Sequence, residues 1–182
     1  MVKTEKRLGK PQEEEPEKAD GRGAATREMI LAAAREVFSR HPYHAASIRM
    51  IAAQGSFYHG LIRYHFPSKA AIFEAVVEEI CSELLKQNRE WLMEAAGLSP
   101  DQALSLYLDR FIAYHRSRPE TFRIVVKNLS QEDGEEIPGY HHLRDLLSGS
   151  RADFTRLFAG LFTESSLTCF LESFNTLIIH YL

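Results

Sequence analysis

The sequence predicts an all-α fold in which three short helices precede a long helix, and further helices follow. Apolar residues recur at three- and four-residue spacing over most of the chain, which is the pattern of helices with one buried face. Proline and small polar residues divide this pattern into segments, and none of the segments alternates as a half-buried β-strand does. A chain of 182 residues can bury the core of one or two domains.

The first two helices have clear boundaries. An apolar stripe starts at Thr26 and ends near Arg40, because Pro42 cannot continue a helix. Ser47 is a suitable N-cap for a second, short helix, and a turn that starts at Gly55 ends it. These signals separate two helices that are neighbours in the chain.

The third helix is short and rich in aromatic residues. It is expected over residues 58–64, with Gly60 in its middle, and Pro67 separates it from the next helix. Ser68 is a good N-cap for a long fourth helix, whose apolar stripe runs to about Glu94.

Further helices fill the rest of the chain. Ser99 and Gln102 predict a capping box at the start of a fifth helix, and a sixth follows it. The stretch QEDGEEIPG, residues 131–139, is a loop by its composition. Two more helices are expected, at about 140–162 and 165–182.

The charge is distributed unevenly. The net charge is -3, yet residues 21–73 hold seven basic and two acidic side chains, and residues 81–182 hold ten basic and fourteen acidic ones. This polarity indicates an anionic partner for the first segment and a different role for the second. The two cysteines are too few for a disulfide framework, and the chain shows neither an apolar leader nor a membrane-spanning run. We therefore expect a cytoplasmic protein with no membrane contact.

Three parts of the chain are predicted from these signals. Residues 1–23 mix both charge signs with proline and glycine, which predicts a disordered N-terminal arm. Residues 24–71 form the group of short helices, and residues 72–182 form a helical C-terminal domain.

Three short helices before a long one, in a segment of positive net charge, are typical of a helix-turn-helix motif. In that motif the second helix of the pair enters the major groove of DNA, which is about 12 Å wide. The third predicted helix has residues suited to this role. Gly60 allows the backbone to approach DNA closely, and His59 and Arg63 have polar side chains long enough to reach it. Its buried anchor is expected to consist of Phe57, Ile62 and Phe66.

The second helix contains the stretch SIRMIA, and the third helix with the start of the fourth reads GLIRYHFPSKAAIF. With these stretches at this spacing, residues 26–76 resemble the DNA-binding domain of the TetR family of transcriptional regulators. Beyond Val77 the resemblance is one of architecture only. It implies an N-terminal helix-turn-helix domain that the long helix joins to a ligand-binding and dimerisation domain.

The resemblance implies roles for individual residues in the DNA-binding domain. The positions that read bases in the family are occupied by His59, Gly60, Leu61 and Arg63. Contacts with the DNA backbone are implied for Ser47, Arg49, Tyr58, Tyr64, His65 and Lys69.

The chain departs from the family pattern at three positions. Family members usually have glycine at Ser56, serine or threonine at Leu61, and often tyrosine at Arg63. Leu61 cannot hydrogen-bond a base but can pack on a thymine methyl group, whereas Arg63 can bind a guanine edge or a phosphate. The operator sequence therefore stays open, while the resemblance implies the binding mode.

Several residues of the C-terminal domain combine an aromatic ring with a polar tip, and from the residues alone an ordinary core is the default interpretation. The resemblance implies a ligand cavity among the fourth to eighth helices. A mostly apolar cavity would suit a small apolar or aromatic effector. The candidate pocket residues are Trp91, Tyr107, Phe111, Tyr114, His115 and Phe122.

The last predicted helix carries an apolar stripe that fits either a core or a dimer face. The resemblance implies a homodimer built from the last two helices of each copy. Because the chain ends at Leu182 after about eight expected helices, either the interface is reduced or the sequence is truncated. The candidate dimer-face residues are Leu167, Phe170, Leu171, Phe174, Leu177, Ile178 and Tyr181.

No nucleophile elbow, phosphate loop or paired carboxylates indicate an enzyme. His41 and His44 lie in a loop without a cysteine or carboxylate at ligand spacing, so no metal site and no cofactor are predicted. His141 and His142 are adjacent, so on a helix they should project about a third of a turn apart, at the surface.

The sequence and the resemblance together predict a transcriptional regulator, expected to be a repressor. It would bind a palindromic operator in double-stranded DNA as a homodimer, and a small-molecule effector in the C-terminal domain would release it. The alternative is a non-catalytic small-molecule-binding or adaptor protein that keeps a relic helix-turn-helix. The basic set Arg49, Arg63 and Lys69 distinguishes the two, since a relic has no reason to retain it.

Overall fold

The computed structural model of the chain describes residues 16–129, 137–157, 165 and 169. Within these residues the chain forms helices and no strands, which confirms the all-α prediction. The helices are α1 (Pro16–Arg40), α2 (Ile48–Gly55), α3 (His59–His65), α4 (Lys69–Ala95), α5 (Pro100–Ser117), α6 (Pro119–Leu129) and α7 (Tyr140–Leu157).

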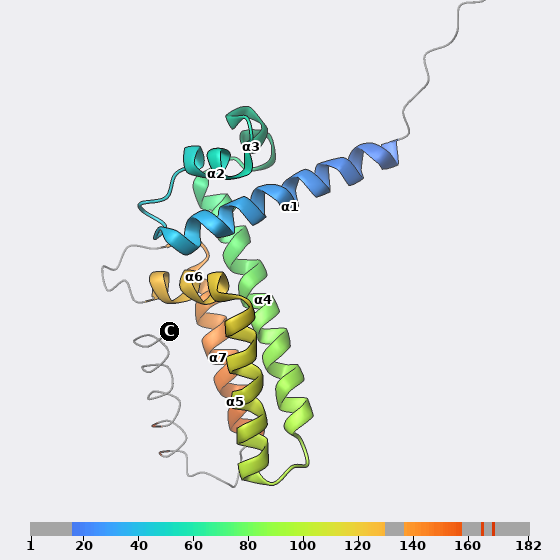
Figure 1. The fold of residues 1–182 in the computed structure, drawn as a ribbon, viewed down its shortest axis with the longest axis vertical. Coiled ribbons are helices and arrows are strands. Elements are labelled where there is room, and N and C mark those ends of the chain that lie inside the picture. Colours follow the sequence, from blue (N-terminus) through green and yellow to red (C-terminus); the bar gives the residue numbers. More distant parts are fainter. Residues whose placement is uncertain (1–15, 130–136, 158–164, 166–168, 170–182) are drawn as a thin grey trace, which may run out of the picture.

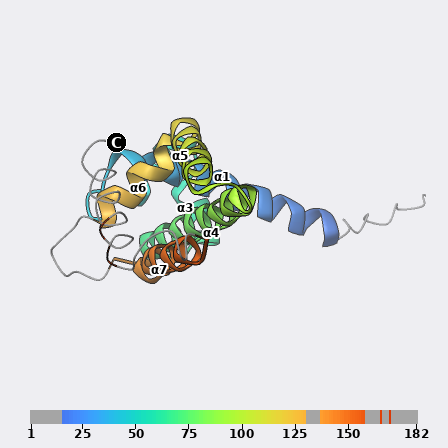
Figure 2. The same ribbon diagram turned by 90° about the horizontal axis from the view of Figure 1, so that it is seen from below.

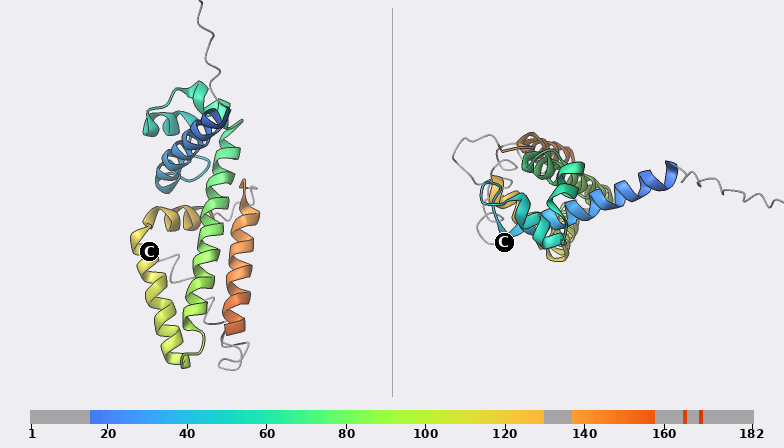
Figure 3. Two further views of the ribbon diagram at one scale, coloured as in Figure 1. Left: turned by 90° about the vertical axis from the view of Figure 1, so that its right-hand side faces the viewer. Right: turned by 90° about the horizontal axis from the view of Figure 1, so that it is seen from above.

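The helices are arranged along α4, which runs through most of the length of the molecule (Figure 1). Helices α1, α2 and α3 gather at the end where α4 begins, and the first half of α1 projects away from the other helices (Figure 1). Helices α5 and α7 lie on different sides of α4, as seen in Figure 2 and in the left view of Figure 3. The short α6 crosses near the end of α1 and packs against it.

Helix α1 begins earlier than the sequence predicts. It starts at Pro16, so residues 16–23 are helical, and the expectation of a disordered arm over residues 1–23 is wrong for that part. Proline is favoured in the first helical turn, and the glutamate, lysine and alanine residues that follow are good helix formers. They outweigh Gly21 and Gly23, which had suggested a break. Residues 1–15 lie outside the described residues.

The predicted helix caps are confirmed in detail. The Ser47 hydroxyl accepts a hydrogen bond from the N–H of Met50 at 3.3 Å and starts α2, and Ser68 caps α4 in the same way. At the start of α5, the side-chain carbonyl of Gln102 accepts hydrogen bonds from both the N–H and the hydroxyl of Ser99. The starts of α2, α4 and α5 therefore follow from local hydrogen bonds that the sequence encodes.

Two hydrophobic clusters form the core, and α4 contributes to both of them. The first cluster joins the helix-turn-helix unit to the start of α4, to α6 and to the first half of α7, with Phe38 packed edge-to-face on Phe73. The second cluster joins the end of α4 to α5 and to Phe154 of α7. Helix α4 therefore contributes to the core of both the helix-turn-helix unit and the rest of the helical body.

The predicted C-terminal helices are described only in part. Helix α7 ends at Leu157, while residues 158–162 and nearly all of the helix expected at 165–182 lie outside the described residues. Residues 131–136 of the predicted loop do so as well. Among the helices that the structure describes, none has the length and apolar character needed to cross a membrane.

The turn between α2 and α3 generates a prediction about stability. Ser56 has φ 55° and ψ 37°, the left-handed conformation that favours glycine. We expect Ser56→Gly to raise the free energy of unfolding by about 0.5–1 kcal/mol, because glycine adopts this conformation without steric strain. Urea unfolding followed by circular dichroism measures the change.

The matched control is Ser82→Gly, at an exposed position inside α4. Glycine in a helix interior should lower the free energy of unfolding by about 0.5 kcal/mol. A decrease of the same size for Ser56→Gly would contradict the argument.

Candidate nucleic-acid interface and effector region

The outer face of α3 is exposed along its whole length. All four predicted base-reading residues are exposed, including the apolar Leu61 at 37%. Tyr58 and Tyr64, on either side of them, are 89% and 84% exposed. Apolar side chains that gather on one exposed surface are typical of interaction sites. The helix therefore presents an unusual mixture of aromatic and basic groups to the solvent.

The inner face of α3 is firmly anchored, as the sequence predicts. Ile62 is 0% and Phe66 3% exposed, and both belong to the first core cluster. Phe57 packs against the same cluster. Its ring occupies the place where a side chain at Gly55 would begin, so Gly55 must be glycine for this packing. The anchor fixes the direction in which the outer face points.

Gly60 has no such internal reason to be glycine. A Cβ atom built there would meet no other atom within 4 Å, and its backbone conformation is helical. Glycine inside a helix costs about 1 kcal/mol relative to alanine. An external surface that approaches the backbone of α3 would account for this cost, so the role in close approach stays a prediction with this observation in its favour.

Helix α2 contributes two of the predicted backbone contacts. Ser47 is half-buried as the N-cap, and its hydroxyl proton remains available because the oxygen acts as the acceptor for Met50. Arg49 is exposed on the outer side of the same helix. His65 is half-buried at the end of α3, with its ring against that of Tyr64 at a centroid distance of 5.1 Å.

Lys69 has a structural role that the sequence did not reveal. Its ammonium group donates hydrogen bonds to the carbonyls of Tyr43 at 2.9 Å and Ala46 at 3.1 Å, and it lies 4.2 Å from the centre of the Tyr43 ring. Burial lowers the pKa of this ammonium. Lys69 thus ties the α1–α2 loop to the start of α4, and contact with a phosphate remains a prediction for its third proton. The carbonyls lie 26 and 23 residues earlier in the chain, which local patterns cannot detect.

Comparison with known proteins agrees with this geometry. Residues 30–76 match the family model of bacterial regulatory proteins of the tetR family. The chain is also 37% identical over 65 residues to the HTH-type transcriptional regulator UidR of Escherichia coli strain K12, a match that covers 36% of this chain. Residues 30–76 are therefore similar to the DNA-binding domain of TetR-type regulators, and both matches describe regulatory proteins.

Solved structures of transcriptional regulators share the fold over most of the chain. The structure of the hemolysin II transcriptional regulator HlyIIR superposes with a TM-score of 0.65 at 20% identity. The match covers 87% of this chain and 87% of HlyIIR. FadR from Bacillus subtilis, determined in complex with stearoyl-CoA, gives a TM-score of 0.64 at 18% identity, over 84% of this chain and 82% of that chain. By contrast, this chain matches only 33% of the length of the curated relative UidR. The TetR-type sequence similarity is therefore concentrated in the helix-turn-helix domain.

The six predicted effector-pocket residues come together in one aromatic cluster of the TetR-type body. The Trp91 ring of α4 lies against three rings of α5, with centroid distances of 6.1, 6.4 and 5.5 Å. His115 continues the cluster to Phe122 of α6 at 4.8 Å. The rings are packed on one another, as the core interpretation requires.

Several polar atoms in this aromatic cluster have no partner among the described residues. They are the Tyr114 hydroxyl, Nδ1 of His115 and the side-chain amide nitrogen of Asn88. The carbonyl of Asn88 accepts a hydrogen bond from Tyr107 at 2.7 Å. Burial lowers the pKa of His115 to about 4 and raises that of Tyr107 to about 12. Buried polar atoms without partners are expensive, and a polar group of a ligand would satisfy them.

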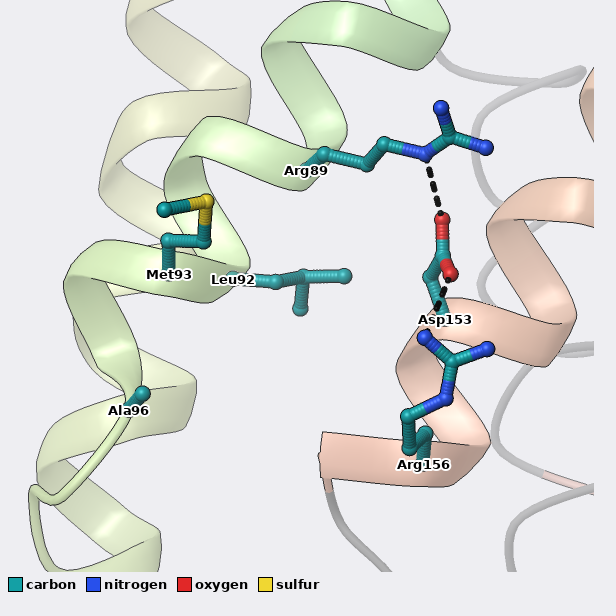
Figure 4. A pocket seen from close by; sticks show the side chains of 6 residues that line it. All are labelled: Arg89, Leu92, Met93, Ala96, Asp153 and Arg156. Carbon is teal, nitrogen blue, oxygen red and sulfur yellow. Dashed lines mark hydrogen bonds and ion pairs between the residues drawn. The ribbon is translucent and has the colours of Figure 1, made fainter.

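An open groove lies elsewhere, on the side of α4 that faces α7 (Figure 4). Arg89 of α4 donates from Nε to Asp153 of α7 at 3.1 Å, and Arg156 approaches the same carboxylate at 3.5 Å. Leu92 points between the two helices, and the remaining lining comes from α4 (Figure 4). The groove shares no residue with the predicted pocket.

The predicted dimer face cannot be placed in this structure. Leu167, Phe170, Leu171, Phe174, Leu177, Ile178 and Tyr181 all lie outside the described residues.

The hydrogen bonds of Lys69 generate a prediction about stability. We expect Lys69→Met to lower the free energy of unfolding by about 1–3 kcal/mol, because two loop carbonyls lose their donor while the aliphatic stem is kept. Urea unfolding measures this. Lys86→Met is the control, since Lys86 is exposed on α4 and has only a 3.9 Å ion pair with Glu90. Equal effects of the two variants would contradict the structural role.

His115 provides a prediction about pH. Its pKa is about 4 in the folded chain and about 6.5 in an unfolded one, so the unfolded state binds more protons between these values. The contribution is fully present above pH 6.5 and is lost as the pH falls toward 4. We expect the protein to lose about 1–2 kcal/mol of stability from this group between pH 7 and pH 5.

Chemical unfolding at a series of pH values measures the effect. His115→Phe should flatten the dependence, because phenylalanine does not titrate and suits the surrounding aromatic rings. His59→Gln, at an exposed position, should leave the slope unchanged. An identical slope for His115→Phe and the unmodified protein would show that His115 is not the group responsible.

Proposed function

We propose that the protein is a transcriptional repressor that binds a palindromic operator as a homodimer and is released by a small effector bound in its helical body. The observation that carries the proposal is the outer face of α3, which is exposed, aromatic and basic while its inner face is anchored in a TetR-type core. A helix of this kind fits the major groove, and the cytoplasm is the compartment in which such a regulator would meet DNA.

Each residue of this face has a proposed role that follows from its chemistry. His59 and Arg63 would donate hydrogen bonds to base edges, with guanine as the natural partner of arginine. Leu61 would pack on a thymine methyl group, and Gly60 would let the backbone approach the bases. Arg49 would bind a phosphate, assisted by Ser47, Tyr58, Tyr64 and His65 along the edges.

Two exposed arginines favour this function over a relic motif. Neither Arg49 nor Arg63 takes part in an ion pair of the described residues. In contrast, Arg35 and Arg118 are each paired with a glutamate of α4. An adaptor that no longer binds DNA has no use for unpaired arginines next to exposed tyrosines. This argument rests on Arg49 and Arg63 alone, since Lys69 has internal partners.

The effector is proposed to enter the aromatic cluster formed by Trp91, Tyr107, Phe111, Tyr114, His115 and Phe122. An apolar or aromatic molecule with one polar group would match its rings and its polar atoms without partners. The structurally similar FadR from Bacillus subtilis binds stearoyl-CoA, so a long acyl chain belongs among the compounds to test. Entry of a ligand would require the packed rings to move apart.

Helix α6 offers a physical route from this cluster to the DNA-binding unit. Phe122 at the start of α6 belongs to the cluster, and Lys127 near its end donates to the carbonyls of Ser39 and Arg40 at 2.7 and 2.9 Å. Asn128 accepts a hydrogen bond from the N–H of Tyr43 at 3.3 Å. A displacement of α6 would therefore pull on the end of α1 and on the loop before α2 through these hydrogen bonds. Such coupling is reciprocal, so DNA would also weaken effector binding.

Selection from a pool of random duplexes at fixed salt tests the proposal. We expect an enriched palindrome, with two half-sites about one helical turn apart, because two copies of α3 must read it. Compounds that raise the melting temperature of the protein are then tested for release of that duplex. Absence of any enriched sequence would refute DNA recognition, and enrichment of a single half-site would refute the dimer.

The exposed arginines provide a quantitative prediction. Arg49→Ala should weaken binding to all sequences and lower the slope of log affinity against log salt by about one, as expected for one lost phosphate contact. Arg63→Ala should cost about 1–3 kcal/mol on the selected duplex and relax the preference at one base position. Binding titrations at several salt concentrations measure both effects.

The matched control is Arg123→Ala, at an exposed position on α6. It should leave both the affinity and the salt slope unchanged. If all three variants behaved alike, the binding would depend on the net charge of the protein and not on the face of α3.

A further inference from the structure

Three potential metal ligands meet where α7 begins. One ligand atom from each of Glu74, His141 and His142 lies within 4.8 Å of the other two. Glu74 belongs to the second turn of α4, and the two histidines to the first turn of α7. Glu74 and His141 are exposed and His142 is half-buried, so an ion can reach the group from solvent.

The backbone holds these side chains together. Gly139, just before α7, has φ 75°, and a Cβ atom built on it would lie 3.2 Å from the Cα atom of Glu74. The turn is thus pressed directly against α4 at the position of the carboxylate. Ile137 and Leu143 on either side are 6% and 1% exposed and belong to the first core cluster. The three ligands therefore project from a well-anchored junction between two helices.

The two histidine rings lie closer together than their adjacent positions on a helix suggest. Adjacent residues on a helix project about 100° apart, yet the ring centroids of His141 and His142 are 3.9 Å apart. The described residues provide no hydrogen bond or ion pair that would account for this gathering of two imidazoles and a carboxylate. Two imidazoles and one carboxylate therefore lie close together, and their side chains have no hydrogen-bond or ion-pair partner among the described residues.

The donor set selects a class of ion. Two imidazole nitrogens and one carboxylate oxygen suit Zn²⁺, Co²⁺ and Ni²⁺, whereas Mg²⁺ and Ca²⁺ prefer oxygen ligands alone. Ligand atoms about 2.0–2.2 Å from a tetrahedral ion lie about 3.4 Å from each other, so small rotations of these side chains are sufficient. The N-terminus of α7 disfavours a cation, and the negative charge of Glu74 offsets that effect.

We propose that Glu74, His141 and His142 form a binding site for a divalent transition-metal ion, which joins the first part of α4 to the start of α7. The ion takes one ligand atom from each side chain and keeps water in its remaining position. Because α4 is the helix that directly follows α3, a bound ion stiffens the end of the body next to the DNA-binding unit. Only this last consequence rests on the proposed function.

Metal titration of the full chain, freed of any purification tag and treated with EDTA, tests the site. Co²⁺ should give the absorption bands of a low-symmetry site with one equivalent per chain, and Zn²⁺ should displace it. Zn²⁺ should also raise the melting temperature, and Mg²⁺ should not. DNA is absent from the assay, so its result is independent of operator binding.

Variants identify the ligands. His141→Ala, His142→Ala and Glu74→Gln should each weaken Zn²⁺ binding at least tenfold, with circular dichroism used to check that the fold is kept. Glu78→Gln, at an exposed position one turn further along α4, should bind as the unmodified chain does. The proposal is overturned if Zn²⁺ does not bind, if the three variants bind as tightly as the unmodified chain, or if Glu78→Gln loses affinity equally.

Discussion

The long helix α4 is the constraint on which the rest of the structure depends. Its first half supplies Phe73 and Val76 to the core of the helix-turn-helix unit, and its second half supplies Trp91 and Leu92 to the aromatic cluster of the body. A displacement of α4 would therefore change the packing of both clusters. The aromatic cluster, the metal-ligand group and the anchored end of α3 are all positioned relative to this one helix.

Four basic residues in or next to the helix-turn-helix region fall into two groups with different physical roles. Lys69 satisfies backbone carbonyls within that unit, and Lys127 does the same from α6. Arg49 and Arg63 instead face solvent on α2 and α3. Both groups raise the positive charge of the chain, and the two arginines have no ion pair among the described residues. The two lysines tie the loop before α2 to α4, and the end of α1 to α6.

Local signals predicted much of the fold and part of the candidate site. Ser47 and Ser68 identified the starts of α2 and α4, since capping depends on residues within one helical turn. The exposure of Arg63 and the burial of Ile62 followed from the helical period. The mixed charges, prolines and glycines of residues 1–23 predict disorder, whereas α1 begins at Pro16.

The sequence by itself determined most of the described helices, their caps, the TetR-type resemblance of the helix-turn-helix region and the exposed face of α3, because each depends on residues that are close together in the chain. Only the tertiary structure decided the contacts between distant segments. Lys69 reaches the Tyr43 carbonyl across 26 residues, and Glu74 meets His141 only because α7 packs along α4. Periodicity and capping describe one helix at a time, whereas these contacts arise from the packing of whole helices, which no local pattern encodes.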